Sequence, residues 1–162
     1  EMKDKKFKRA LTILNNEDCK DFVMKNSSLL DNLLKMDDQQ FERGLEMMHD
    51  AKLKSFITRL PEKLIYITET NDLYERGLAI INNDHYRDFA IKNSPWLTES
   101  LRMSDKQFER AIEIMNNEES KALVMENPDL LMNLVKTNPP NNSLSAKLAT
   151  RLSITSKQEH HK

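Results

Sequence analysis

The sequence predicts an all-α protein, an α-solenoid of four tandem helical repeats with a C-terminal capping helix. One short string recurs at residues 7–11, 41–45, 74–78 and 108–112, so its starts are 34, 33 and 34 residues apart. Apolar residues follow helical spacing, as at Phe108, Ala111, Ile112 and Met115. The 162 residues include only two glycines and five prolines, too few for the turns of an all-β fold. A unit of this length buries its apolar face by stacking on its neighbours.

The repeat starts divide the chain into four units, at residues 7–40, 41–73, 74–107 and 108–136. We expect each unit to hold two longer helices and a short third helix. Residues 137–142 read as a linker because prolines and asparagines interrupt the pattern there. Leucines at 144, 148 and 152 predict a capping helix over 143–154, and we expect residues 155–162 to be disordered.

Polar residues mark where the helices begin and end. Ser104 with Gln107, and Asp37 with Gln40, have the spacing of a capping box. Each Asn-Asn pair, such as residues 82–83, is expected to close the first helix and open the second. The first Asn would adopt the left-handed conformation, and the second would cap the next helix. Ser94–Pro95 and Asn127–Pro128 predict the start of the third helix.

Composition excludes several classes of protein. The formal net charge of -1 removes overall electrostatic attraction as a reason to bind nucleic acid or anionic lipid. No apolar run is long enough to cross a membrane, and the first residues lack the apolar segment of a secretory signal. The single cysteine, Cys19, excludes an internal disulfide. We expect a soluble, cytoplasmic monomer without membrane insertion.

An arginine recurs at the same place in every unit, at Arg9, Arg43, Arg76 and Arg110. One interpretation is structural: each arginine bonds to an acidic group or a helix C-terminus in the adjacent unit. The other is functional: the four arginines form a row of bidentate donors for an acidic partner. Repetition alone does not separate the two, and Arg9 is the poorest test of the first because no unit precedes it.

Two aromatic residues break the repeat pattern and are candidate partner-binding residues. Tyr86 aligns with Lys20 and Lys54. Trp96 aligns with Leu30, Lys63 and Leu130 of the other units. For Trp96, beside Pro95 at a helix start, local packing is the competing interpretation.

No residue pattern indicates catalysis, a cofactor or a metal. His49 and His85 lie in different junctions, without a second ligand at the required spacing. Cys19 has no histidine or asparagine placed to activate it. We therefore predict that the protein is not an enzyme, and that it uses no cofactor and binds no metal.

The dipeptides at residues 15–16, 49–50, 82–83 and 116–117 resemble the variable dipeptides of TAL effector repeats, which have a similar period and read one DNA base per unit. This resemblance implies nucleic-acid binding as the alternative function. However, acidic residues such as Asp84 follow the dipeptides here, where those repeats have phosphate-contacting glycines and a Lys-Gln pair.

The Asn- and Lys-rich, Gly-poor composition, with helical repeats and a polar C-terminal tail, resembles host-directed effector proteins of intracellular bacteria such as Legionella. That resemblance implies translocation into a host cell and a host protein as the target. The main prediction is a protein-binding repeat scaffold or adaptor.

Overall fold

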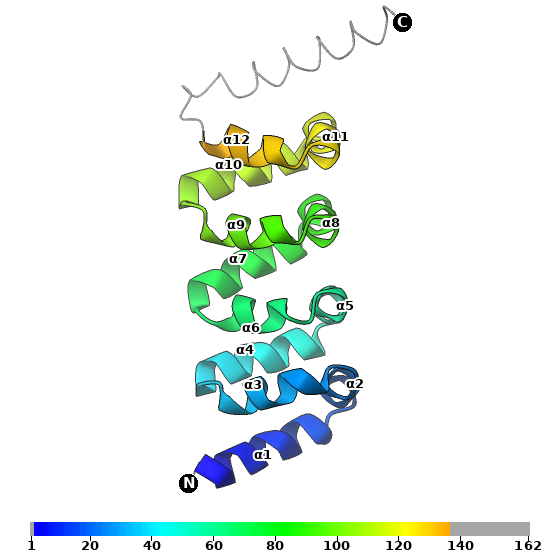
Figure 1. Cartoon of the computed structure of the whole chain (residues 1–162), viewed down its shortest axis with the longest axis vertical. Helices are drawn as coiled ribbons and strands as arrows, with labels where there is room; N and C mark the ends of the chain where they lie inside the picture. Colours follow the sequence, from blue (N-terminus) through cyan, green and yellow to red (C-terminus); the bar gives the residue numbers. More distant parts are fainter. Residues whose placement is uncertain (1, 137–162) are drawn as a thin grey trace, which may run out of the picture. The chain divides into compact units, whose positions relative to one another are not determined.

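The computed structural model describes residues 2–136, and every regular element among them is helical (Figure 1). The predicted linker, capping helix and tail (137–162) lie outside the described residues. The elements are α1 (Met2–Leu14), α2 (Glu17–Lys25), the short 3-10 helix η1 (Ser27–Leu29), α3 (Leu30–Lys35), α4 (Asp38–His49), α5 (Ala51–Arg59), α6 (Lys63–Thr68), α7 (Asn71–Ile81), α8 (Asp84–Lys92), α9 (Pro95–Arg102), α10 (Asp105–Asn116), α11 (Glu118–Glu126) and α12 (Asp129–Lys136). The prediction of an all-α protein is confirmed for these residues.

Helix lengths recur in a fixed order along the chain. A helix of 11 to 13 residues (α1, α4, α7, α10) precedes one of nine residues (α2, α5, α8, α11). A short helix of six to eight residues then follows (α3, α6, α9, α12). In the third and fourth predicted units both inner helices begin where the sequence predicts: α8 and α11 follow the Asn-Asn pairs, α9 begins at Pro95, and α12 begins directly after Pro128.

The described chain divides into two compact units, one that ends at Ser94 and one that begins at Pro95, and the division falls inside the third predicted repeat. In the first unit, the long helix α4 packs against the α5 and α6 that follow it and the α2 and α3 that precede it. Helix α7 contacts α5, α6 and α8 in a similar way. Figure 1 shows α2, α5 and α8 of this unit nearly end-on, while α1, α4 and α7 run across the view. In the second unit, α10 contacts α9, α11 and α12.

The core of the first unit repeats with the sequence. The long helices contribute Ile13, Met47 and Ile80, each fully buried. The nine-residue helices contribute Phe22, Phe56 and Phe89, of which none exposes more than 2% of its surface. In the second unit the core includes Ala111, Ile114, Met115, Leu131 and Val135. Equivalent positions thus bury equivalent side chains.

The second asparagine of each Asn-Asn pair is an N-cap, as predicted, and Asp50 caps α5 in the same way. The side-chain oxygens of Asn16, Asp50, Asn83 and Asn117 accept hydrogen bonds from backbone N–H groups in the first turn of the next helix, at 2.9–3.1 Å. The prediction for the first residue is wrong. No described non-glycine residue has a positive φ, and Asn82 is right-handed, with φ -81° and ψ -7°.

The two predicted capping boxes differ. Ser104 and Gln107 bond reciprocally, which confirms the first. Asp37 accepts from the Gln40 N–H at 2.8 Å, but the Gln40 side chain donates to the Ile65 carbonyl and the Thr68 hydroxyl of α6 instead of bonding back. Gln40 therefore joins two helices rather than closing its own.

The two glycines occupy equivalent helical positions with different surroundings. A Cβ on Gly44 would meet Leu33 Cδ2 at 3.5 Å, an ordinary contact, whereas a Cβ on Gly77 would lie 2.6 Å from Ile67 Cγ2. The first and fourth predicted repeats carry Ala10 and Ala111 at this position.

We predict opposite effects for the two alanine substitutions. Gly44→Ala should raise the free energy of unfolding by about 0.5–1 kcal/mol, because alanine restricts the unfolded chain and favours the helix. Gly77→Ala should lower it, because the branched Ile67 side chain cannot give way without moving its helix. Urea unfolding followed by circular dichroism measures both. Equal gains for the two variants would contradict the close α6–α7 packing.

Candidate functional site

Arg9, the first residue of the arginine column, bonds to several groups of α3 and α4. Its guanidinium donates to the Leu34 carbonyl at 3.0 Å, to the Met36 carbonyl and to Asp38 Oδ1 at 2.8 Å. It also lies over the Phe41 ring, 4.6 Å from the ring centroid. Only 6% of Arg9 is exposed. This residue therefore ties α1 to the end of α3 and the start of α4.

Two other arginines make the equivalent bond. Arg43 Nη1 donates to the Thr68 carbonyl at 2.9 Å, and Arg110 Nη1 donates to the Val135 carbonyl at 3.2 Å. In all three cases, including Arg9 with Leu34, the acceptor lies 25 residues further along the chain. The acceptors belong to the last turn of the short helix, whose carbonyls have no partner within that helix. Arg76 occupies the equivalent position on α7 and is half-buried.

This geometry corrects the expectation about the bonding partners of the arginines. The arginines bond to a helix C-terminus, as the structural interpretation proposed, but that helix belongs to the same repeat and not to an adjacent one. Arg9 consequently needs no preceding unit, and it is the strongest test of the structural role rather than the poorest.

Tyr86 and Trp96 have different environments. Tyr86 is fully buried, and its ring meets the Phe89 ring edge-on with centroids 6.2 Å apart. Helix N-caps align it with the buried Cys19 and Leu53, so the alignment with Lys20 and Lys54 is wrong by one residue. Its side chain is part of the core and offers no surface to a partner. Trp96 is half-buried near the start of α9.

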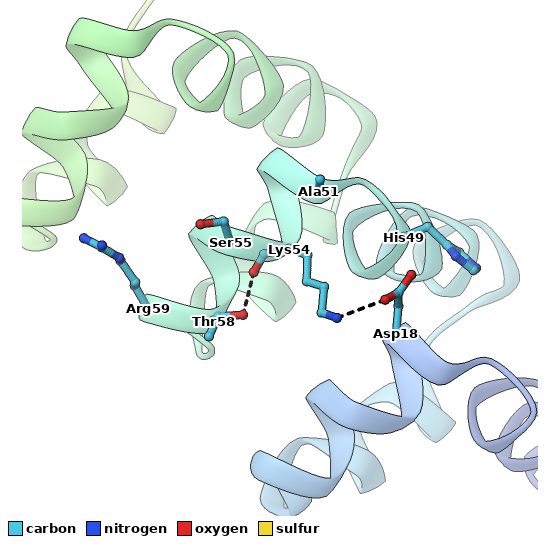
Figure 2. Close-up of a pocket in the computed structure, with 7 residues that line it drawn as sticks. All are labelled: Asp18, His49, Ala51, Lys54, Ser55, Thr58 and Arg59. Carbon is cyan, nitrogen blue, oxygen red and sulfur yellow. Dashed lines mark hydrogen bonds and ion pairs between the residues drawn. The ribbon is translucent and has the colours of Figure 1, made fainter.

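A surface pocket of about 430 Å³, which we call the α2–α5 pocket, lies within the first unit. It is lined by Asp18 of α2, His49 of α4, and Ala51, Lys54, Ser55, Thr58 and Arg59 of α5 (Figure 2). The pocket-lining residues of α5 recur three or four positions apart, so they lie on one helix face. Sequence reasoning missed this pocket, because its shape depends on how α2, α4 and α5 pack.

Polar contacts hold one end of the α2–α5 pocket. Lys54 Nζ lies 3.1 Å from Asp18 Oδ1, which links α5 to α2. The Asn16 amide nitrogen lies 3.3 Å from each ring nitrogen of His49. Figure 2 shows Arg59 at the other end of α5, away from Asp18, and Arg59 is exposed. A ligand entering from that end meets a cation that is not paired with Asp18.

Helix α5 differs in charge from the other nine-residue helices. It carries Lys52, Lys54 and Arg59 and no acidic residue, whereas α2, α8 and α11 each carry two or three acids. A second pocket, of about 550 Å³, is lined by two acids, one cation and two amides: Asp38, Glu42, Arg43, Gln39 and Asn71. The α2–α5 pocket thus combines a concave surface with two cations of α5, Lys54 and Arg59.

The structure does not arrange Cys19 as a nucleophile or the described acidic, histidine and cysteine side chains as a metal site. Cys19 is fully buried, and burial first, then the Asp18 carboxylate, raise the pKa of its thiol. The reactive thiolate is thus disfavoured. Among residues 2–136, no group of three His, Cys, Asp or Glu side chains is placed to hold a metal ion. In the same range, no helix is long and apolar enough to cross a membrane.

Comparison with known proteins identifies no relative: no family model, curated protein or solved structure matches this chain.

We predict that removing an arginine weakens the fold in proportion to its bonds. Arg43→Ala should lower the free energy of unfolding by about 1–3 kcal/mol, because the buried carbonyl loses its donor. Arg9→Ala should cost more than Arg43→Ala, since it breaks three hydrogen bonds and a ring contact. Glu42→Ala, on the exposed side of α4, is the control and should change stability by less than about 0.5 kcal/mol. Urea midpoints that are equal for all three variants would disprove a structural role.

Proposed function

We propose that this chain is a monomeric, non-enzymatic scaffold or adaptor that binds another protein. In this proposal the recurring long, nine-residue and short helices are four tandem repeats stacked as an α-solenoid. The observation that carries the proposal is how the polar residues are used. Those that recur in equivalent positions, the arginines and the junction N-caps, bond within the chain. Polar residues that differ between repeats therefore remain to recognise a partner.

The α2–α5 pocket is the surface that best fits this role. Where Ala51 and Ser55 stand in α5, the first repeat has Glu17 and Asp21. The loss of those acids leaves Lys54 and Arg59 beside small, exposed side chains, which give a partner close access to the helix. Cations and hydroxyl groups on one face of a helix suit a protein segment that carries carboxylates.

Two observations weigh against the nucleic-acid alternative. The junction residues Asn16, Asn83 and Asn117 already accept backbone hydrogen bonds as N-caps, so those oxygens are engaged within the chain. In addition, α2, α8 and α11 begin with acidic residues, which would repel phosphate. We therefore favour a protein partner. The compositional resemblance to bacterial effectors extends the proposal to a host protein as the partner.

Site-specific photocrosslinking tests this proposal. A photoreactive phenylalanine analogue is placed at Ser55, in the α2–α5 pocket, or at Ala122, the equivalent exposed position of α11. Tagged protein from living cells should yield a discrete crosslinked protein from position 55 and not from position 122. The double variant Lys54→Glu with Arg59→Glu should abolish that product, because it reverses the charge of the pocket.

Crosslinked products that are the same from both positions would contradict recognition by this pocket. A product from position 55 that contains nucleic acid, or the lack of any product there, would contradict the proposed protein scaffold.

A further inference from the structure

Helix α1 exposes an apolar stripe of three residues, and two of these three positions are buried on the other long helices of the first unit. Phe7, Leu11 and Leu14 are 65%, 42% and 47% exposed. The equivalents of Phe7 and Leu14 on α4 are Phe41, 6% exposed, and Met48, fully buried. Helix α4, which carries the equivalent stripe, packs against α2 of the preceding repeat. On α1 the same three side chains face outward.

The charge of α1 is also unlike that of the other long helices. It carries five cationic residues and one acid, a net charge of +4, within Met2–Leu14. With histidine neutral, α4 has one cation and three acids, which gives -2. Helix α7 has one cation and two acids, and α10 has two cations and three acids, so each is -1. The formal charge of -1 for the whole chain conceals this local excess.

The cations divide into two groups by their contacts. Lys5 and Arg9 both bond to Asp38, and Lys5 first, then Arg9, lower the pKa of that carboxyl. Lys6 and Lys8 lie on the two flanks of Phe7, each about 100° around the helix from it. Lys8 is exposed, whereas Lys6 is half-buried and, after Lys35, helps to lower the pKa of the Asp31 carboxyl. Lys3 also lies one turn before Phe7, on the exposed side. Lysines therefore border the apolar stripe on both sides.

The charge at position 8 distinguishes α1 from the long helices that pack against a preceding repeat. The equivalent residues are Glu42, Glu75 and Glu109, so the first repeat alone reverses this charge. A stripe bordered by glutamate packs on a neighbouring helix in α4 and α7. The stripe of α1 has the same apolar spacing, but Lys8 replaces the bordering glutamate. This change of charge favours contact with a negatively charged surface.

We propose that α1 docks the protein on an anionic lipid bilayer surface. Phe7, Leu11 and Leu14 would enter the boundary between headgroups and acyl chains, while Lys3, Lys6 and Lys8 contact lipid phosphates. An acidic helix of a partner protein would contact the lysines on one side of the stripe more readily than those on both sides. An anionic bilayer offers phosphates to the lysines on both sides at once. The binding is peripheral, since the stripe lies along one side of a helix held to the protein by its other side.

Arg9 makes this surface preformed. Its bonds to α3 and α4 fix α1 as a helix before any membrane is present. An unstructured basic peptide must order itself on binding, but α1 avoids that entropic cost. Helix α1 does not line the α2–α5 pocket, so the protein can use it for a bilayer independently of a protein partner.

Cosedimentation with lipid vesicles tests the proposal. The full chain is mixed with vesicles of phosphatidylcholine alone, or of phosphatidylcholine and phosphatidylserine in a ratio of two to one. We expect binding to the anionic vesicles, weakened by added salt, and little binding to the neutral ones. The triple variant Lys3→Glu, Lys6→Glu, Lys8→Glu should bind at least about a hundredfold more weakly, because each lysine at such a surface contributes about fivefold.

A second triple variant, Lys20→Glu, Lys52→Glu, Lys106→Glu, is the matched control. It changes the net charge equally at exposed positions on α2, α5 and α10 and should retain binding. Phe7→Ala with Leu11→Ala, at exposed positions that leave the core intact, should also reduce binding to anionic vesicles. Circular dichroism should show unchanged helix content in all three variants. No binding by the natural chain, equal binding to both kinds of vesicle, or equal loss in the control variant would overturn the proposal.

Discussion

The structure depends on one interaction, the hydrogen bond from a long-helix arginine to the end of a short helix. The short helices span only six to eight residues, too few to be stable without tertiary contacts. Arg9, Arg43 and Arg110 each reach a carbonyl 25 residues ahead and close the repeat on itself. A charged donor on an otherwise unpaired carbonyl at the negative end of a helix is favourable both as a hydrogen bond and electrostatically.

This use of arginine determines which residues remain for function. The polar side chains that recur in equivalent positions bond within the chain. The residues that differ between repeats are therefore the candidates for binding a partner. Helix α5 lacks the acids of its equivalents and lines a pocket, and α1 has Lys6 and Lys8 where the other long helices have neutral residues and glutamate, respectively. We interpret the first as a protein-binding surface and the second as a bilayer-binding surface. Both proposals concern positions where one repeat departs from the pattern that the others share.

Local features of the fold could be predicted from the sequence, whereas pairings between helices could not. N-caps such as Asn83 and the Ser104–Gln107 box depend on neighbouring residues, so their spacing is sufficient evidence. The acceptor of Arg43 and the α2–α5 pocket depend on how separate helices meet. Tyr74 illustrates the same limit: it replaces phenylalanine on an apolar stripe, and burial first, then the Glu46 carboxylate of the neighbouring long helix, raise the pKa of its hydroxyl. The exposure of Phe7 likewise depends on what packs against α1.

Hydrogen exchange in the native state tests the role of the arginines most directly. Helix α6 is bonded by Arg43, whereas α3 is bonded by Arg9, so each helix reports on its own arginine. In Arg43→Ala, the backbone amides of α6 should exchange faster than in the natural protein, while those of α3 keep their protection. Unchanged exchange in α6, or an equal loss of protection in α3 and α6, would contradict the claim that each arginine holds the short helix of its own repeat.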